Sequence, residues 1–119
     1  MKKETENREL PLQLAFVDSL KKLMLGWTEQ NEIKLHTIEC VVPFVLTDKS
    51  LSVWLFYDTD KTKSDYEING MNDLVKTQYI HLLKELNYPA DYLKEVIFII
   101  DSDENVRRNY EGNYFYRLR

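Results

Sequence analysis

The sequence predicts an α+β domain built on a mixed β-sheet. Three observations indicate this class: a continuous apolar run bounded by charges, two neighbouring segments with alternating apolar residues, and segments with helical apolar periodicity. Continuous apolar runs are typical of strands covered on both faces, and period-2 alternation is typical of strands covered on one face. We therefore expect about four strands in a mixed sheet with helices packed against it, in the order α-β-β-α-β-α-β.

Length, charge and the absence of long apolar runs limit the possible classes of protein. The chain has 119 residues, so we expect a single globular domain over residues 1–119, with the polar residues 1–9 frayed. The net charge of −4 argues against a general nucleic-acid-binding role, which needs a basic surface. Residues 1–9 lack the apolar centre of a secretory leader, and no apolar run approaches a membrane span. A cytoplasmic protein is expected.

The first predicted helix is amphipathic. It is expected to open at Leu10–Pro11, because proline is tolerated in a first helical turn, and to end at Gly26. Its apolar face is predicted to carry Leu12, Phe16, Leu20, Leu23 and Trp27, with Val17 and Met24 beside them. This spacing favours a helix that packs on the core of the domain.

A hairpin is predicted next. Its strands are Ile33–Leu46 and Leu51–Tyr57, joined by the turn Thr47–Ser50. Pro43 cannot donate a backbone hydrogen bond, so a bulge or an unpaired edge is expected there. The return strand should place Leu51, Val53, Leu55 and Tyr57 on one face and Trp54 and Phe56 on the other.

The second half of the chain is expected to begin with a long polar loop, Asp58–Gly70. A helix over Met71–Asn87 follows, with an apolar stripe at helical spacing, and Pro89–Leu93 is expected to add one more helical turn. The run Glu95–Asp101 is predicted to be the central strand of the sheet, buried on both faces.

The end of the chain is predicted to form a short helix and a strand. Asp101 or Ser102 should cap the helix, which runs to Tyr110 and stops at Gly112. The strand Asn113–Arg119 is expected to turn Tyr114, Tyr116 and Leu118 inward and Arg117 and Arg119 to the surface. The alternative for this arginine- and tyrosine-rich tail is a clamp for single-stranded RNA.

Metal and catalytic sites find little support in the sequence. Asp101, Asp103 and Asn105 match the start of a calcium loop, but Val106 stands where glycine is needed and Gly112 where glutamate is needed. His36 and Cys40 are expected on one strand face, too far apart for a thiolate–imidazole pair, with Cys40 in the core. We therefore expect no metal, no cofactor and no catalytic residue, and so not an enzyme.

Carboxylates suggest the candidate binding site. The predicted partner-binding residues are Asp58, Asp60, Asp65, Glu67, Asp101, Asp103 and Glu104. Such a surface would attract a basic protein and make association sensitive to salt. The alternative is a small-molecule site, or a small enzyme, at the carboxyl end of the central strand, where Asp101 would face the ligand.

The segment from Asp101 to Tyr116 has an unusual composition, and the chain contains eight tyrosines. In its small size, acidic balance, mixed α/β order, abundant tyrosine and lack of a recognisable active site, the chain resembles the small bacterial immunity proteins that neutralise toxins delivered between competing cells. This resemblance implies a protein-binding inhibitor. Such proteins occupy a toxin's active site or an adjacent surface, and a basic nuclease is one kind of target.

Overall fold

The structure, a computed structural model, describes residues 17–41 and 51–118. Its sheet has the strand order β1-β2-β3: β1 (Leu35–Val41) pairs antiparallel with β2 (Leu51–Tyr57), and β2 pairs parallel with β3 (Val96–Ser102). The α+β class and the mixed sheet are confirmed, whereas a fourth strand is not found in the described residues. The predictions for residues 1–9, Leu10–Pro11, Pro43 and Thr47–Ser50 lie outside these residues.

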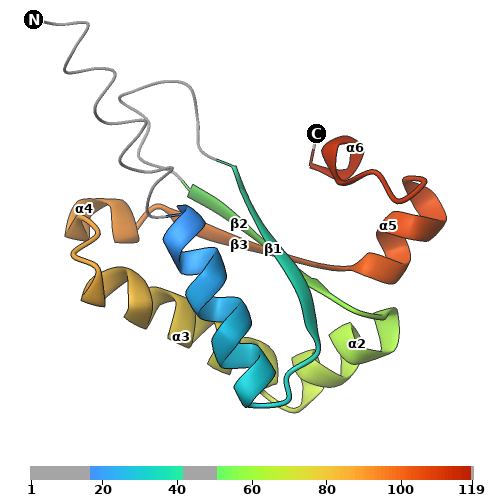
Figure 1. Ribbon diagram of the computed structural model, residues 1–119, viewed down its shortest axis with the longest axis horizontal. Helices are drawn as coiled ribbons and strands as arrows, with labels where there is room; N and C mark the ends of the chain where they lie inside the picture. The colour runs from blue at the N-terminus through green and yellow to red at the C-terminus, as the bar shows by residue number, and fades with distance from the viewer. Residues whose placement is uncertain (1–16, 42–50, 119) are drawn as a thin grey trace, which may run out of the picture.

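Six helices surround the sheet in the part of the chain that the structure describes (Figure 1). They are the N-terminal helix, described over residues 17–30, α2 (Asp60–Ile68), α3 (Met71–Glu85), α4 (Ala90–Leu93), α5 (Asp103–Asn109) and α6 (Tyr114–Arg117). The predicted long helix and the short turn after it are confirmed as α3 and α4. Asn87 ends the α3 segment with a φ of 64°, a left-handed conformation that stops a helix.

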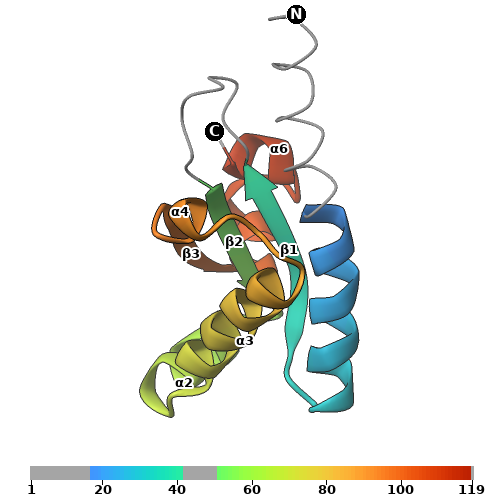
Figure 2. The same ribbon diagram turned by 90° about the vertical axis from the view of Figure 1, so that its left-hand side faces the viewer.

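The core lies between one face of the sheet and two helices. Alternate residues of β2 point into it, and they meet residues at helical spacing from the N-terminal helix and α3. Fully buried members are Leu51, Val53 and Leu55 of β2, Leu20 and Met24 of the N-terminal helix, and Val75, Tyr79 and Leu83 of α3. Figure 2 shows the N-terminal helix running alongside β1. The predicted hairpin faces and the apolar stripe of α3 therefore organise this core.

The N-terminal helix differs from its prediction at two points. Leu20 and Met24 are fully buried, while Leu23, placed on the apolar face by the sequence, is about half exposed. Gly26 does not end the helix, which continues to residue 30. Thr28, one half-turn beyond the glycine, is buried and donates a hydrogen bond to the Leu25 carbonyl (3.0 Å). Tertiary packing beyond Gly26 outweighs the roughly 1 kcal/mol that a glycine costs inside a helix.

The central strand is β2, so the prediction that Glu95–Asp101 forms the buried centre of the sheet is wrong. The apolar residues of β2 from Leu51 to Tyr57 are essentially inaccessible on the core side. In β3, Ile97 is 52% exposed, and none of the five apolar residues from Val96 to Ile100 is fully buried. An apolar run shows that both faces of a strand are apolar, but it does not specify the strand's neighbours.

Two segments have a different secondary structure from the one predicted. The expected loop Asp58–Gly70 contains α2, whose first turn is capped by Thr59. The expected strand Asn113–Arg119 contains α6, in which the Asn113 side chain accepts a hydrogen bond from the Tyr116 amide (3.1 Å). Tyr116 is consequently exposed and Arg117 is largely covered, the reverse of the prediction; Arg119 lies outside the described residues.

A bulge in β1 separates His36 from Cys40. The register of β1 shifts between Leu35 and Thr37, so an extra residue stands opposite β2 at His36. Bulges redirect side chains, and here His36 contacts residues of α5 and α6 while Cys40 packs against the core with its Sγ 3.4 Å from the Tyr79 hydroxyl. Their predicted common face is therefore wrong. Cys40, predicted to be a buried core residue, is partly buried and packs against the core, and burial raises the pKa of its thiol to about 11.

Candidate functional site

The carboxyl ends of β2 and β3 lie side by side because the two strands are parallel. The last pair in their register is Tyr57 with Ser102, and a helix begins directly after each strand. Thr59 caps α2 by accepting the Thr62 amide (3.1 Å), and Ser102 caps α5 by accepting the Asn105 amide (3.0 Å). The predicted capping role of Ser102 is confirmed. Two helix N-termini, each favourable for negative charge, thus meet at one edge of the sheet.

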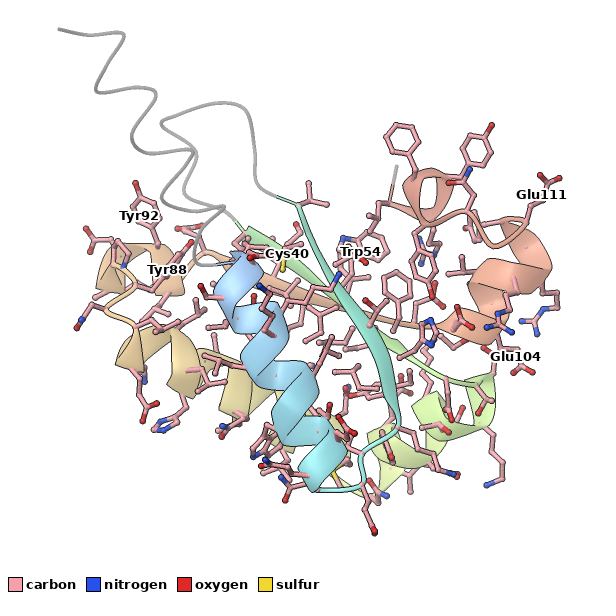
Figure 3. All side chains as sticks on the ribbon, viewed as in Figure 1. Cys40, Trp54, Tyr88, Tyr92, Glu104 and Glu111 are labelled. Carbon is pink, nitrogen blue, oxygen red and sulfur yellow. The ribbon has the colours of Figure 1, made fainter. Side chains whose placement is uncertain are left out.

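Side chains of the two helices bind across this junction. Glu104 of α5 accepts a hydrogen bond from the Asp60 amide at the start of α2 (2.9 Å). In return, the Ser102 hydroxyl donates to the carboxylate of Asp60. Figure 3 shows Glu104 at the junction between α5 and α2. Each helix start is therefore stabilised by a carboxylate from the other segment.

Five of the seven predicted site residues come together here. We call them the acidic edge; they are Asp58, Asp60, Asp101, Asp103 and Glu104. The other two residues, Asp65 and Glu67, lie farther along α2, where Asp65 pairs with Lys61 on the exposed side of the helix (2.7 Å). The sequence therefore predicted a real cluster, although part of it is internal rather than a free surface.

Asp101 is the most enclosed carboxylate of the acidic edge, with 4% of its surface exposed. Its Oδ2 atom lies 2.5 Å from Nε of Arg117, and the Asn105 side-chain amide donates to both of its oxygens (3.0 and 3.1 Å). The Arg117 guanidinium also stacks 4.7 Å from the Trp54 ring. The expectation that Asp101 faces a ligand or a partner is therefore not met, because its carboxylate anchors the C-terminal helix to the sheet.

Asp103 joins three parts of the chain and is also buried. Its Oδ2 atom forms an ion pair with Nε of Arg107 (2.7 Å). Its Oδ1 atom accepts from the Tyr114 hydroxyl and lies 3.4 Å from Nε2 of His36. Tyr114 packs edge-on against Phe56 (4.8 Å between ring centres). Burial, reinforced by the hydrogen bond to Asp103, raises the pKa of Tyr114. The hydroxyl therefore stays protonated and donates.

Asp60 pairs with Arg108. The Nη2 atom of Arg108 lies 2.8 Å from Oδ2 of Asp60. The hydrogen bond from Ser102, followed by that from Arg108, lowers the pKa of Asp60. Every arginine in the described residues thus has a carboxylate partner. This pairing speaks against the RNA-clamp alternative for the tail, since Arg117 is covered and the other two arginines are compensated.

Sequence reasoning missed the basic and aromatic partners of the acidic edge. They are His36, Arg107, Arg108, Tyr114 and Arg117. Asp103 and Arg107 are separated by four residues in a predicted helix, a spacing that pairs side chains and could have signalled their contact. No comparable local signal existed for Arg117, whose partner lies sixteen residues away.

The accessible part of the site is a shallow depression and a pair of aromatic side chains. The depression has a volume of about 480 Å³ and is lined by Asp58, Thr59, Asp103, Glu104, Arg107 and Arg108. It presents both charge signs. Beyond it, α6 carries Phe115 and Tyr116, which are 65% and 53% exposed. The arrangement offers an aromatic and charged contact surface, with its buried carboxylates already satisfied by hydrogen bonds.

Asp60 gives this site a defined dependence on pH. A carboxyl group with a lowered pKa in the folded state stabilises the fold above its unfolded pKa of about 4, and this contribution is lost as pH falls through the folded value. We expect an Asp60→Asn variant to lose less stability than the wild type between neutral and strongly acidic pH. Urea denaturation at several pH values measures this difference. Equal curves for wild type and Asp60→Asn would contradict the assignment.

Comparisons with protein-family models, with curated proteins and with solved structures found no match for this chain. In the described ranges, no helix is long and apolar enough to cross a membrane. Among those same residues, no group of three or more histidine, cysteine, aspartate or glutamate side chains is arranged to hold a metal ion.

Proposed function

We propose that this protein is a binding protein that inhibits a partner protein, in the manner of a toxin-immunity protein. The observation that supports this most directly is the exposed aromatic pair Phe115–Tyr116 on a helix that is anchored by buried contacts on either side of it. Tyr114 is bound to Asp103, and Arg117 is bound to Asp101. A short helix held at both ends presents its aromatic side chains in one fixed arrangement, which lowers the entropic cost of binding.

The surroundings of the aromatic pair also favour a protein partner. We define the α5–α6 surface as Glu104, Arg107, Arg108, Phe115 and Tyr116, all of them exposed. Aromatic residues and arginine are enriched at protein interfaces, and a few of them usually supply most of the binding energy. The net charge of −4 would steer a basic partner toward the protein. The proposed partner is accordingly a basic protein, such as a cognate toxin.

A binding role is favoured over the small-molecule alternative by the state of the acidic edge. That alternative needs Asp101 to face a ligand, whereas Asp101 is buried and bound by Arg117 and Asn105. Asp103 is similarly enclosed. In this proposal both residues position the α5–α6 surface, and the accessible acids, among them Glu104, contact the partner.

The test is co-expression of the protein with the products of its neighbouring genes, followed by affinity capture and a growth assay with any toxic product. We expect one such product to be retained and its toxicity to be suppressed. A Phe115→Ala/Tyr116→Ala double variant should bind at least about tenfold more weakly, as expected for the loss of interface hot spots.

Ile68→Ala is the matched control, because Ile68 is also an exposed apolar residue but lies at the end of α2. It should bind and protect as the wild type does. If no neighbouring product is retained, the inhibitor proposal fails. If a product is retained equally by the double variant, the partner binds elsewhere and the α5–α6 surface is the wrong assignment.

A further inference from the structure

The guanidinium group of Arg117 occupies a site that is made by other parts of the chain. Its central carbon lies 4.7 Å from the centre of the Trp54 ring and 5.3 Å from the centre of the Tyr110 ring. Nε of Arg117 lies 2.5 Å from Oδ2 of Asp101. We call Trp54, Tyr110 and Asp101 the arginine site. They belong to β2, the end of α5 and β3, so α6 supplies only the ligand.

The arginine site is held in place by contacts outside α6. The Asn105 side-chain amide donates to both carboxylate oxygens of Asp101 (3.0 and 3.1 Å). The Trp54 ring stacks on the Phe56 ring, with 6.0 Å between their centres. Nε1 of Trp54 is buried and has no acceptor among the described residues, so the indole contributes its ring face and no hydrogen bond. A carboxylate and two aromatic rings are thus arranged for a planar cation.

The chemistry of the arginine site selects a guanidinium group. A guanidinium stacks on aromatic faces and pairs with a carboxylate at the same time, whereas a lysine ammonium is a compact, strongly hydrated point charge. The site is largely covered, since 21% of the Arg117 side chain and 4% of Asp101 are exposed. A weakly hydrated guanidinium loses less than an ammonium on entering such a site. We therefore expect the site to prefer arginine to lysine.

The tail that supplies this ligand is bound to the domain through few groups. Helix α6 has four residues, and none of them is buried. The backbone amides of Arg117 and Leu118 donate to carbonyls of the tail itself (3.2 and 3.0 Å). The Tyr114 side chain binds Asp103, and the Arg117 side chain binds the arginine site. Because a single helical turn is not stable alone in water, loss of these side-chain contacts would release α6.

We propose that the arginine site also binds an arginine of another polypeptide, which displaces Arg117 and releases α6. The present occupant identifies this ligand, because it is itself an arginine within a polypeptide chain. Free arginine fits less well, since its own carboxylate would lie close to the carboxylates of the acidic edge. Arg117 is tethered to the site, so its high effective concentration makes an outside arginine bind weakly until α6 is loosened.

Release of α6 would remove Phe115 and Tyr116 from their docked positions. Binding of an outside arginine and presentation of the α5–α6 surface then exclude each other, which makes the arginine site a regulatory one. Only this regulatory consequence rests on the proposed function. The binding of arginine is tested without a partner protein, so its failure is distinct from failure of the inhibitor proposal.

The experiment measures binding of Nα-acetyl-arginine methylamide, a peptide-like arginine, to the full chain by NMR through the Nε1–H signal of Trp54. We expect Arg117→Ala to bind this probe at least about tenfold more tightly than the wild type, because the tethered competitor is absent. Tyr114→Phe should show an intermediate affinity, since it loosens α6 and leaves the arginine site intact. Wild-type affinity in Tyr114→Phe, or no binding to folded Arg117→Ala, overturns the proposal. If Arg117→Ala does not fold, Tyr114→Phe decides alone.

Two controls separate this result from general attraction of a cation to an acidic protein. Nα-acetyl-lysine methylamide carries the same charge and should bind every variant more weakly, so equal binding of the two probes would contradict a guanidinium site. Lys61→Ala removes one positive charge, as Arg117→Ala does, but Lys61 pairs with Asp65 on α2. It should bind the arginine probe as the wild type does. If it binds as tightly as Arg117→Ala, the probe responds to net charge and the proposal fails.

Discussion

Replacing Asp101 by alanine is expected to lower the free energy of unfolding by about 3–5 kcal/mol. The change leaves the Arg117 guanidinium, whose side chain is only 21% exposed, without its carboxylate. It also removes the acceptor of the Asn105 side-chain amide. Removing one member of a covered ion pair costs more than the pair contributes, because the remaining charge is poorly solvated. Chemical denaturation of the purified variant at neutral pH measures the loss.

Two further variants show whether the loss comes from the unpaired charge. In the Asp101→Ala background, Arg117→Met should restore part of the stability, since it removes that charge and keeps apolar contact with Trp54. Asp65→Ala removes an exposed carboxylate paired only with Lys61 and should change stability by no more than about 0.5 kcal/mol. If Asp101→Ala is as mild as Asp65→Ala, then Asp101 does not anchor α6.

Leu55→Ala is expected to cost about 2–5 kcal/mol, while Ile97→Ala should cost well under about 1 kcal/mol. Leu55 lies in β2 and is completely buried, so truncation leaves a cavity in the core. Ile97 lies in β3 and is half exposed, so its truncation removes little burial. Urea denaturation of the two purified variants provides the comparison. Similar costs at the two positions would contradict the strand order β1-β2-β3.

Local pattern in the sequence was sufficient for the elements whose apolar residues recur with a clear period. The alternation in Leu51–Tyr57 predicted β2 and the faces of its side chains, and the stripe from Met71 to Leu86 predicted α3. The hydroxyl of Ser102 ahead of three polar residues predicted the start of α5. In each case the contacts that matter lie within one turn or one strand, or on a single apolar face, so the sequence encodes them locally.

Beyond the local caps Thr59 and Asn113, tertiary contacts decided α2 and α6. Between Asp60 and Ile68 the only buried residue is Thr62, so no apolar stripe marks α2. The start of α2 is held by Glu104 and Ser102, and Tyr66 packs on Tyr57 (5.0 Å between ring centres). Glu104 and Ser102 lie more than 40 residues away in sequence, and Tyr57 belongs to the preceding strand β2.

The C-terminal segment shows why period-2 alternation was misleading. A strand would have turned Tyr114 and Arg117 to opposite faces, because they are three residues apart. A helix places residues three apart on one side, where Tyr114 reaches Asp103 and Arg117 reaches Asp101. The helix is favoured because it brings hydrogen-bond donors to these two covered carboxylates. Both carboxylates lie outside the tail, so the tail sequence does not specify them.

The acidic edge was also predicted only in part from the sequence. The sequence determined that carboxylates follow β2 and β3, and parallel pairing of those strands brought five of them together. Only the fold decided that Asp101 and Asp103 are buried and that arginines compensate them. The strand order was also decided by the tertiary structure. Apolar side chains in a strand indicate which of its faces are covered. The neighbouring strands, in contrast, bind through backbone hydrogen bonds, which are the same for every residue except proline.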